Sequence, residues 1–295
     1  MGKFSSRIPD LNLINSQSKN EFNKNMEEFD SLKDNLAETD EIDDLKSTLI
    51  DLASFKQSST NGIKSNFYFT PDLRVIFPLE VGEYLYRAVS FPKEMAIKQS
   101  LFSIRSNDET TSSGRLHSPH KPVLYLSTNK KTAITEANTN ANNTSYIAKF
   151  KVIKPTCLRS IFVSANPFTG EPLDDADKFS LEDNEGFPNW YTTTVNEMIK
   201  RTFMIPDLKN NPLGYKLTLA IANTFFPLKE DLQIRPHCSG WLYNSVFSNN
   251  NASKNYNIAL QSLAVQNLKL EEIYQYNNNG TIDKCLFPNA DGNLS

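Results

Sequence analysis

Apolar residues recur every three or four positions through the N-terminal part of the chain. They are Phe22, Met26, Phe29, Leu32, Leu45, Leu49 and Leu52. This spacing predicts two amphipathic helices, at about 20–36 and 41–56, with charged residues on their other faces. Two interpretations stay open for this pair: it packs on the main domain, or its acidic surface is a docking site for a partner.

From Phe67 onward the pattern changes to short runs of aromatic and β-branched residues, which are typical of strands. Strands are predicted at 67–69, 75–77, 84–89, 123–126 and 146–153, and again from Leu242, and a further apolar segment runs from Asn257 to Ala264. Helices are predicted at 130–137 and 215–226. Because strands and helices are mixed without regular alternation, the predicted fold class is α+β.

The changes in pattern divide the chain into three parts. Residues 1–60 are predicted to be an acidic helical N-terminal extension, since residues 26–60 include 10 acidic and 3 basic residues. A main domain spans 65–276 and contains an irregular insertion near 164–214, which begins with a stretch rich in prolines and acidic residues. The Asn- and Gly-rich segment 277–295 is predicted to be a loose C-terminal tail.

Composition argues against several classes of protein. The 295 residues carry a net charge of −3, which gives no electrostatic reason to expect direct nucleic-acid binding. No apolar run approaches the roughly 20 residues that cross a bilayer, and no secretory signal is visible, so we expect a cytoplasmic protein without membrane contact. Three well-separated cysteines fit a reducing compartment and argue against a disulfide framework.

The common catalytic motifs are absent. The chain lacks the phosphate-binding loop G-x-x-x-x-G-K-[ST], the dinucleotide fingerprint G-x-G-x-x-G and the nucleophile elbow G-x-S-x-G. Its three histidines are His117, His120 and His237, and they form no H-E-x-x-H motif. The sequence therefore predicts neither a phosphate loop nor a metal site.

Five short motifs instead follow one another along the main domain. They are Tyr86-Arg87, Gly114-Arg115, Val123-Leu124-Tyr125-Leu126 with Glu136 eleven residues after Tyr125, Gly240-x-x-Tyr243-x-Ser245, and Asn257-x-Ala259-Leu260. In this order and spacing, residues 80–275 resemble the RES-domain family, which includes the toxins of RES–Xre toxin–antitoxin pairs. The family is named after an arginine, a glutamate and a serine. The chain departs from the family pattern at Leu116 and His117, where an aromatic residue and asparagine are usual, and at Asn244, which replaces a proline.

The resemblance implies a fold similar to that of the ADP-ribosyltransferase toxins and an activity that destroys NAD+. RES-domain proteins split the bond between nicotinamide and ribose, with water or phosphate as the acceptor, so the enzyme is expected to be a glycohydrolase or a phosphorylase. NAD+ is then the substrate, and no bound cofactor is expected. A toxin of this kind also implies a neutralising antitoxin or immunity protein, and it acts either in the producing cell or after delivery into a rival.

The residue types in the motifs suit this reaction. Breaking the glycosidic bond builds positive charge on the ribose, which a nearby carboxylate such as that of Glu136 stabilises. The planar guanidinium groups of Arg87 and Arg115 suit the two phosphates. The Tyr125 ring offers a face to nicotinamide, and the Ser245 hydroxyl can orient the substrate. The predicted catalytic residues are Arg87, Glu136 and Ser245, and the predicted substrate-binding residues are Arg115 and Tyr125.

Ordinary structural roles are the alternative for each of these residues. Arg87 on a strand could be an ion-pair partner, Tyr125 a core residue, and Glu136 a solvated charge at the end of a helix. Two other functions also stay open for the whole chain. One is transfer of ADP-ribose to a protein target in the same cleft, and the other is a non-catalytic interaction protein whose working surface is the acidic helical region.

Overall fold

A nine-stranded mixed sheet organises the part of the chain that the computed structural model describes, namely residues 16–35, 41–58, 64–68, 76–137, 143–163, 165–171, 189–205, 212–228, 237–246, 255–276 and 282–287. The strand order is β11-β10-β6-β4-β5-β9-β8-β7-β3, and only the β7–β8 pair is parallel. The bounds are β3 Ile76–Leu79, β4 Tyr84–Pro92, β5 Val123–Ser127, β6 Asn143–Val152, β7 Thr156–Ile161, β8 Gly240–Asn244, β9 Tyr256–Gln261, β10 Leu268–Tyr276 and β11 Ile282–Leu286. Together with the helices below, this sheet confirms the predicted α+β class.

The sheet consists of two halves that meet where β4 and β5 pair through a single residue pair, Tyr86 and Ser127. The inward-facing side chains of both halves share one apolar cluster, in which Leu85 and Phe150 from one half meet Leu126 and Ile258 from the other. Because side chains alternate between the two faces of a strand, the odd-numbered residues of β5 and β9 point to the outer face. The candidate site is built on that outer face.

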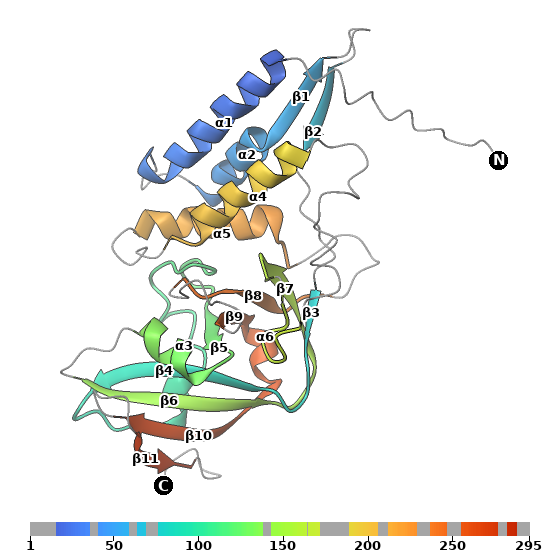
Figure 1. Cartoon of the computed structure of the whole chain (residues 1–295). Coiled ribbons are helices and arrows are strands. Elements are labelled where there is room, and N and C mark those ends of the chain that lie inside the picture. The colour runs from blue at the N-terminus through green and yellow to red at the C-terminus, as the bar shows by residue number, and fades with distance from the viewer. Residues whose placement is uncertain are drawn as a thin grey trace.

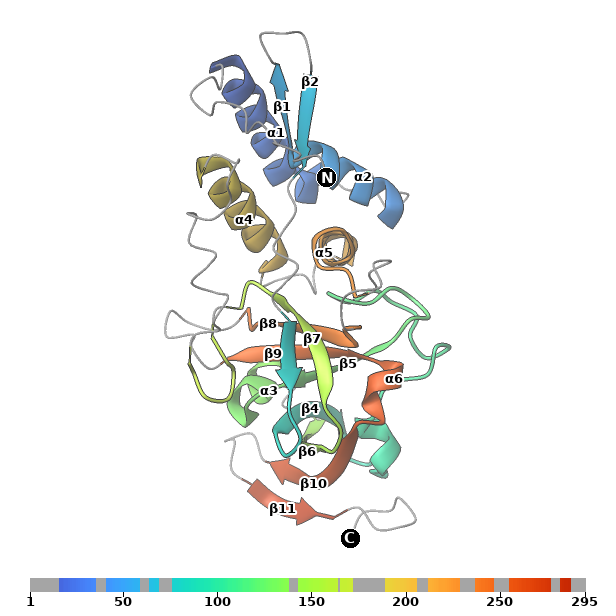
Figure 2. The same ribbon diagram turned by 90° about the vertical axis from the view of Figure 1, so that its right-hand side faces the viewer.

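Four helices lie over the outer face of the β5-β9-β8-β7 half, with α5 next to the sheet and with α1 and α2 packed on α4 and α5 (Figures 1 and 2). Their bounds are α1 Ser16–Asn35, α2 Ile42–Leu52, α4 Asn189–Phe203 and α5 Pro212–Phe225. A second apolar cluster joins Leu49 of α2, Ile199 of α4 and Ile221 of α5 to Trp241 of the sheet. Helices α1 and α2 therefore pack on the main body through their apolar stripes. Three shorter helices, η2 Gln99–Phe102, α3 Lys130–Ala137 and α6 Ser262–Val265, lie elsewhere along the sheet.

The N-terminal part differs from its sequence prediction at the start of the first helix, which begins at Ser16 rather than near residue 20, and after the second helix. The second helix ends at Leu52 rather than near residue 56, and strand β1 (Ser54–Ser58) begins two residues later. This strand pairs with β2 (Lys64–Tyr68) in a two-stranded antiparallel sheet, so a hairpin spans the predicted boundary near residues 60–65. Residues 59–63 between the two strands, and residues 1–15, lie outside the described residues.

Two other predictions need correction. The prediction of an irregular insertion near 164–214 is wrong for residues 189–203, which form α4, and for residues 212–214, which begin α5. Residues 164, 172–188 and 206–211 of this stretch lie outside the described residues. Buried Val195, Ile199 and Phe203 recur in α4 at the spacing of one helix face and pack into the cluster below α1 and α5. The prediction of a loose tail at 277–295 is wrong for residues 282–286, which form β11 and hydrogen-bond to β10 at the edge of the sheet. Residues 288–295 lie outside the described residues.

Candidate active site

A pocket of about 790 Å³ opens on the outer face of the sheet, beside α3 and the start of α5. A cavity of this volume lies within the range of roughly 300–1,000 Å³ that small-molecule sites occupy. Its lining comes from β4, β5, β8, β9, α3, α5 and the loop before β5. Among these described lining residues, Glu136 is the only acidic side chain, whereas Arg87, Arg115 and Lys216 are basic.

The Glu136 carboxylate is held by hydrogen bonds from two strands. Its Oε1 atom accepts a bond of 2.5 Å from the Ser245 hydroxyl and a bond of 2.7 Å from the Asn257 amide Nδ2. The Asn257 Oδ1 atom in turn accepts a bond of 2.7 Å from the Ser127 hydroxyl. Ser127, Ser245 and Asn257 are all buried. The structure therefore joins two of the predicted catalytic residues, Glu136 and Ser245, and adds Asn257 and Ser127 to them.

Local sequence explains why Glu136 lies over these strands. The chain leaves β5 at Ser127 and turns into α3, where the Asn129 side chain accepts hydrogen bonds from the backbone N–H and the hydroxyl of Thr132. This contact is an N-terminal helix cap, which fixes the start of α3. The helix then packs across β4, and Asn257 lies opposite Ser127 in the β5–β9 register. Glu136, near the end of α3, thus reaches the side chains of β8 and β9.

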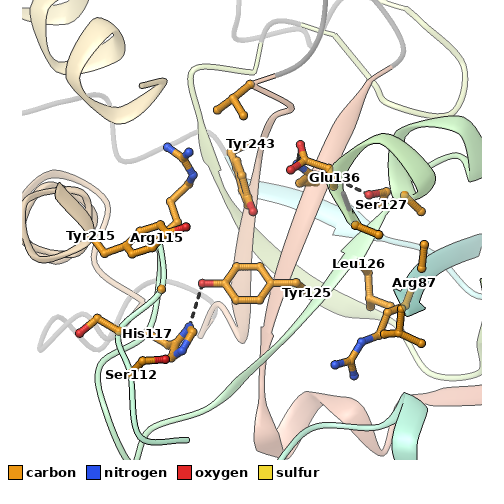
Figure 3. Close-up of a pocket in the computed structure, with 18 of the residues that line it drawn as sticks. Arg87, Ser112, Arg115, His117, Tyr125, Leu126, Ser127, Glu136, Tyr215 and Tyr243 are labelled. Carbon is orange, nitrogen blue, oxygen red and sulfur yellow. Dashed lines mark hydrogen bonds between the residues drawn. The ribbon is translucent and has the colours of Figure 1, made fainter. Parts of the chain in front are cut away.

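Arg87 lies on β4 and lines the pocket together with Glu136. Its Nη1 atom donates to the backbone carbonyl oxygens of Phe102, at 3.0 Å, and of Ser103. Burial lowers the pKa of Arg87 to about 10, which leaves the guanidinium charged at neutral pH. No carboxylate among the described residues forms an ion pair with Arg87, and in Figure 3 its guanidinium points away from Glu136. Within the described part of the chain, the Arg87 guanidinium is thus a charged hydrogen-bond donor that has no acidic partner.

Arg115 lines the opposite side of the pocket, where its guanidinium contacts α4. It donates to the carbonyl oxygens of Phe203 and Ile205, the latter at 2.9 Å, and lies 5.6 Å from the centre of the Phe203 ring. These carbonyls belong to the C-terminal end of α4, where the helix dipole favours a cation. The Arg115 backbone oxygen also accepts a 3.0 Å bond from the Thr218 hydroxyl of α5. Arg115 therefore ties the loop to both helices.

Tyr125 crosses the floor of the pocket toward the same loop (Figure 3). Its hydroxyl accepts a 2.9 Å bond from the Leu116 backbone N–H and lies 3.0 Å from His117 Nδ1. Burial raises the pKa of Tyr125 and lowers that of His117, so both side chains are neutral at physiological pH. The loop leaves no room for a side chain at Gly114, where a Cβ would lie 2.2 Å from His117 Cε1.

Sequence reasoning missed several pocket residues. Asn257 belongs to one of the five motifs, yet nothing in the motif indicates that its amide contacts Glu136. Ser127 lies just beyond the predicted strand 123–126 and is the last residue of β5, and the sequence carries no signal for its role. His117, Tyr215 and Tyr243 also line the pocket. Among the described residues, no group of three or more His, Cys, Asp or Glu side chains could hold a metal ion, and no helix is long and apolar enough to cross a membrane.

Comparison with known proteins gives one match. A family model described as RES domain matches residues 85–275, which is well over half of the chain and includes every predicted site residue. No curated protein and no solved structure matches the chain.

Proposed function

The chain belongs to the RES-domain family, and on that premise we propose that it is an enzyme that degrades NAD+ by cleaving the bond between nicotinamide and ribose. RES domains are known from NAD-related toxins of toxin–antitoxin pairs, so depletion of cellular NAD+ is the proposed toxic effect. The proposal includes the similarity to the ADP-ribosyltransferase toxin fold, with NAD+ as the substrate and no bound cofactor.

The proposed reaction needs one well-placed carboxylate more than it needs an acid. When the ribose C1′–nitrogen bond breaks, its electron pair passes to the positively charged nicotinamide ring, which leaves as a neutral molecule. The ribose is left with oxocarbenium character, which an anion beside C1′ stabilises. Water then attacks this carbon and releases a proton to give ADP-ribose. If phosphate attacks instead, the product is ADP-ribose phosphorylated at the same carbon. We assign the stabilising role to Glu136.

The observation that carries this proposal is the state of the Glu136 carboxylate. Two donors, Ser245 and Asn257, bond to its Oε1 atom, and no described residue hydrogen-bonds to Oε2. Stabilisation of an oxocarbenium ion requires an oriented carboxylate with one oxygen left for the ligand. Glu136 fits this requirement, and the described residues that line the pocket include no other acid. A solvated charge would not need two buried donors.

We assign the diphosphate of NAD+ to Arg87. The diphosphate is separated from the reacting carbon by the whole ribose, which agrees with an arginine that points away from Glu136 (Figure 3). Arg87 has a planar guanidinium and no acidic partner among the described residues, and such a group suits two phosphates. The proposed role of Tyr125 is contact with the nicotinamide ring, and Ser245 holds Glu136. The proposal also keeps a phosphate contact from Arg115, weaker than that of Arg87 because the Arg115 guanidinium already donates to the carbonyl oxygens of Phe203 and Ile205.

The proposal also includes a neutralising antitoxin or immunity protein that blocks the pocket. The acidic surface of α1 and α2, where Glu27, Glu28, Asp43 and Asp44 are exposed, is one place for such a partner to dock. Replacement of these four exposed carboxylates by their amides tests this part and leaves the buried contacts of α1 and α2 in place, and unchanged partner binding would remove the docking role from the extension.

The decisive experiment follows NAD+ loss and nicotinamide release over time with purified protein, with and without phosphate. We expect release by the wild type, an at least hundredfold loss of turnover in Glu136→Gln, and near-normal NAD+ binding by that variant. Glu83→Gln is the matched control, because Glu83 precedes β4 outside the pocket and the same chemical change there leaves turnover intact. Turnover of Glu136→Gln near the wild-type rate would contradict the assigned role.

The dependence on phosphate identifies the acceptor. Faster loss in phosphate, with a phosphorylated sugar product, indicates a phosphorylase, and equal loss indicates a glycohydrolase. If purified protein releases no nicotinamide in either buffer, labelled NAD+ incubated with host lysate tests transfer of ADP-ribose to a protein. Label on a macromolecule would replace the proposed reaction with that transfer.

A further inference from the structure

We infer that Asn257 is a positioning residue for the Glu136 carboxylate, and that Ser127 holds the Asn257 amide in the orientation that this role requires. The inference rests on the proposed function, because it concerns the carboxylate to which that function assigns charge stabilisation. It adds a residue whose contribution the five motifs do not indicate. Asn257 is 5% exposed and lies in β9, between β5 and β8.

The hydrogen-bond partners determine which way the amide faces. A carboxylate oxygen only accepts, so the group within 2.7 Å of Glu136 Oε1 must be the NH2 of Asn257. The amide oxygen then faces Ser127, whose hydroxyl donates to it at 2.7 Å. A flipped amide would place two acceptors against each other at Glu136. Ser127 therefore reinforces the one orientation in which Asn257 donates to the carboxylate.

The two donors to Glu136 differ in how strictly their own geometry fixes the direction of the hydrogen bond. Asn257 pairs with Ser127 on one side and with Tyr243 on the other, so its backbone is fixed by two neighbouring strands. Ser245 follows the end of β8, where its backbone N–H donates to the Asn255 carbonyl oxygen at 2.8 Å, but its hydroxyl turns about a C–O bond whereas the amide of Asn257 is planar. Glu136 lies near the end of a helix of only eight residues. The Asn257 amide is therefore the directional contact that anchors this long side chain to the sheet.

The consequence for the reaction is that the two oxygens of the Glu136 carboxylate have different roles. Oε1 accepts both bonds from the protein, and the Oε2 atom of the same plane is thereby aimed by the Asn257 amide. Charge stabilisation at the ribose depends on the position of that second oxygen. Loss of the Asn257 amide should therefore lower kcat more than it weakens NAD+ binding.

Asn255 provides a matched control two residues before Asn257. Its amide oxygen also lies in a side-chain network, with bonds from Asn129 Nδ2 at 3.2 Å and from the Thr132 hydroxyl at 3.0 Å. This network holds the start of α3, and in the described part of the chain no hydrogen bond joins the Asn255 side chain to Glu136 at the other end of the helix. Substitution of Asn255 thus perturbs the docking of α3 and leaves the carboxylate contact in place.

The kinetic experiment compares Asn257→Ser with Asn255→Ser after both pass a thermal-unfolding check. We expect kcat to fall about 10–100-fold in Asn257→Ser with KM within about threefold of wild type, as for other partners that orient a functional ligand. Asn255→Ser should keep kcat within about threefold of the wild type. Equal losses of kcat in both variants, or an unchanged kcat in Asn257→Ser, would overturn the inference and leave the proposed function standing.

Asn257→Asp adds a readout that a structural role would not produce. At alkaline pH the new carboxylate lies against Glu136, and the two like charges repel. At lower pH one proton is shared, so an O–H group can again donate to the neighbouring oxygen. Of the titratable groups around Glu136, Tyr243 on β8 stays protonated throughout because burial raises its pKa. We expect the ratio of kcat at pH 5.5 to that at pH 8 to rise at least about tenfold over wild type.

A measurement without substrate separates this inference from the proposed function. In 15N-labelled protein, the side-chain NH2 signal that disappears in Asn257→Ser should move to a different chemical shift in Glu136→Gln, because a neutral amide then replaces the charged oxygen that accepts its bond. If the signal moves in this way but the wild type cleaves no NAD+, the proposed function fails and the contact stands. If the signal is the same in wild type and Glu136→Gln, the inference fails whatever the activity.

Discussion

The two sides of the pocket are built in different ways. We call the side chains of β4, β8, β9 and α3 that line it, with Ser127 of β5, the strand wall, and residues 111–119 with the start of α5 the loop–helix wall. In the strand wall, the Glu136 carboxylate is held by side chains, in a series that runs from Ser127 through Asn257 to Glu136 and on to Ser245 behind the wall. Arg87 is the exception in this wall, because its guanidinium donates to backbone carbonyls. In the loop–helix wall, the Arg115 side chain bonds to backbone carbonyls, and the Leu116 N–H bonds to the Tyr125 hydroxyl.

We infer from this difference that the strand wall orients the reacting group and that the loop–helix wall sets the shape of the pocket. A network of side chains directs a carboxylate and leaves one of its oxygens for a ligand, whereas bonds to the backbone fix where a loop runs. Gly114 shows the second purpose, because even a methyl group there would collide with His117. Substitutions in the strand wall should therefore change binding and turnover, and substitutions in the loop–helix wall should first change stability. Three further predictions test this division.

The largest effect is expected at Arg87 in the strand wall. We predict that Arg87→Gln weakens NAD+ binding about 10–100-fold, because a charge-assisted contact to phosphate contributes roughly 1.5–3 kcal/mol. Calorimetry in the Glu136→Gln background measures the Kd without turnover. Arg87→Lys keeps the charge but loses the planar fork, and it should bind with intermediate affinity.

Arg105→Gln is the control for Arg87. Arg105 is exposed, outside the pocket lining, and its charge acts on Arg87, so its loss removes the same charge from the neighbourhood without removing the contact. We expect a change in Kd below about threefold. A Kd for Arg87→Gln equal to that of Arg105→Gln would mean that Arg87 only holds the carbonyls of Phe102 and Ser103.

A smaller effect on binding is expected at Arg115 in the loop–helix wall. We predict that Arg115→Gln lowers the free energy of unfolding by about 1–2 kcal/mol, since the carbonyls at the end of α4 lose charged donors. Hydrogen exchange should locate the loss of protection in the last turn of α4, and the Kd for NAD+ should stay within about threefold of wild type. The Lys variant should recover part of the stability.

The same experiment can contradict the different roles that we assign to the two walls. Arg115 lies in a Gly-Arg motif, and the motif alone predicts a phosphate contact. If Arg115→Gln weakens NAD+ binding at least tenfold while α4 keeps its protection, that prediction is right and the loop–helix wall binds substrate directly.

The two walls also differ in how far the sequence predicts them. The resemblance to the RES-domain family predicts Glu136 and Ser245 as catalytic residues, but the sequence does not predict that they contact each other, because that contact depends on how α3 packs over β8 and β9. The bonds of Arg115 could not be predicted, because backbone carbonyls are present at every residue and leave no mark in the sequence. Helix α4 was missed for another reason: its apolar stripe follows a long polar segment rich in prolines and acids. Strand β11 depends on pairing with β10, which no local pattern indicates.

The smallest effect is expected at His117, where the loop–helix wall meets Tyr125. Burial lowers the pKa of His117, so below about pH 6.5 the unfolded chain takes up a proton more readily than the folded protein does. The stability that depends on a neutral His117 is therefore present above that pH and lost as the pH falls. We predict that the wild type loses roughly 1–2 °C more in Tm between pH 7.5 and pH 5.5 than His117→Gln does.

His237→Gln is the control for His117, because His237 is exposed and outside the pocket lining. Its Tm should follow that of the wild type across the same pH range. If His117→Gln also follows the wild type, protonation of His117 costs the folded protein nothing, and the hydrogen bond to the neutral Tyr125 hydroxyl survives it. The loop would then be held mainly by the Leu116 N–H and by Arg115, and the role of Tyr125 in the loop–helix wall would reduce to accepting one backbone bond.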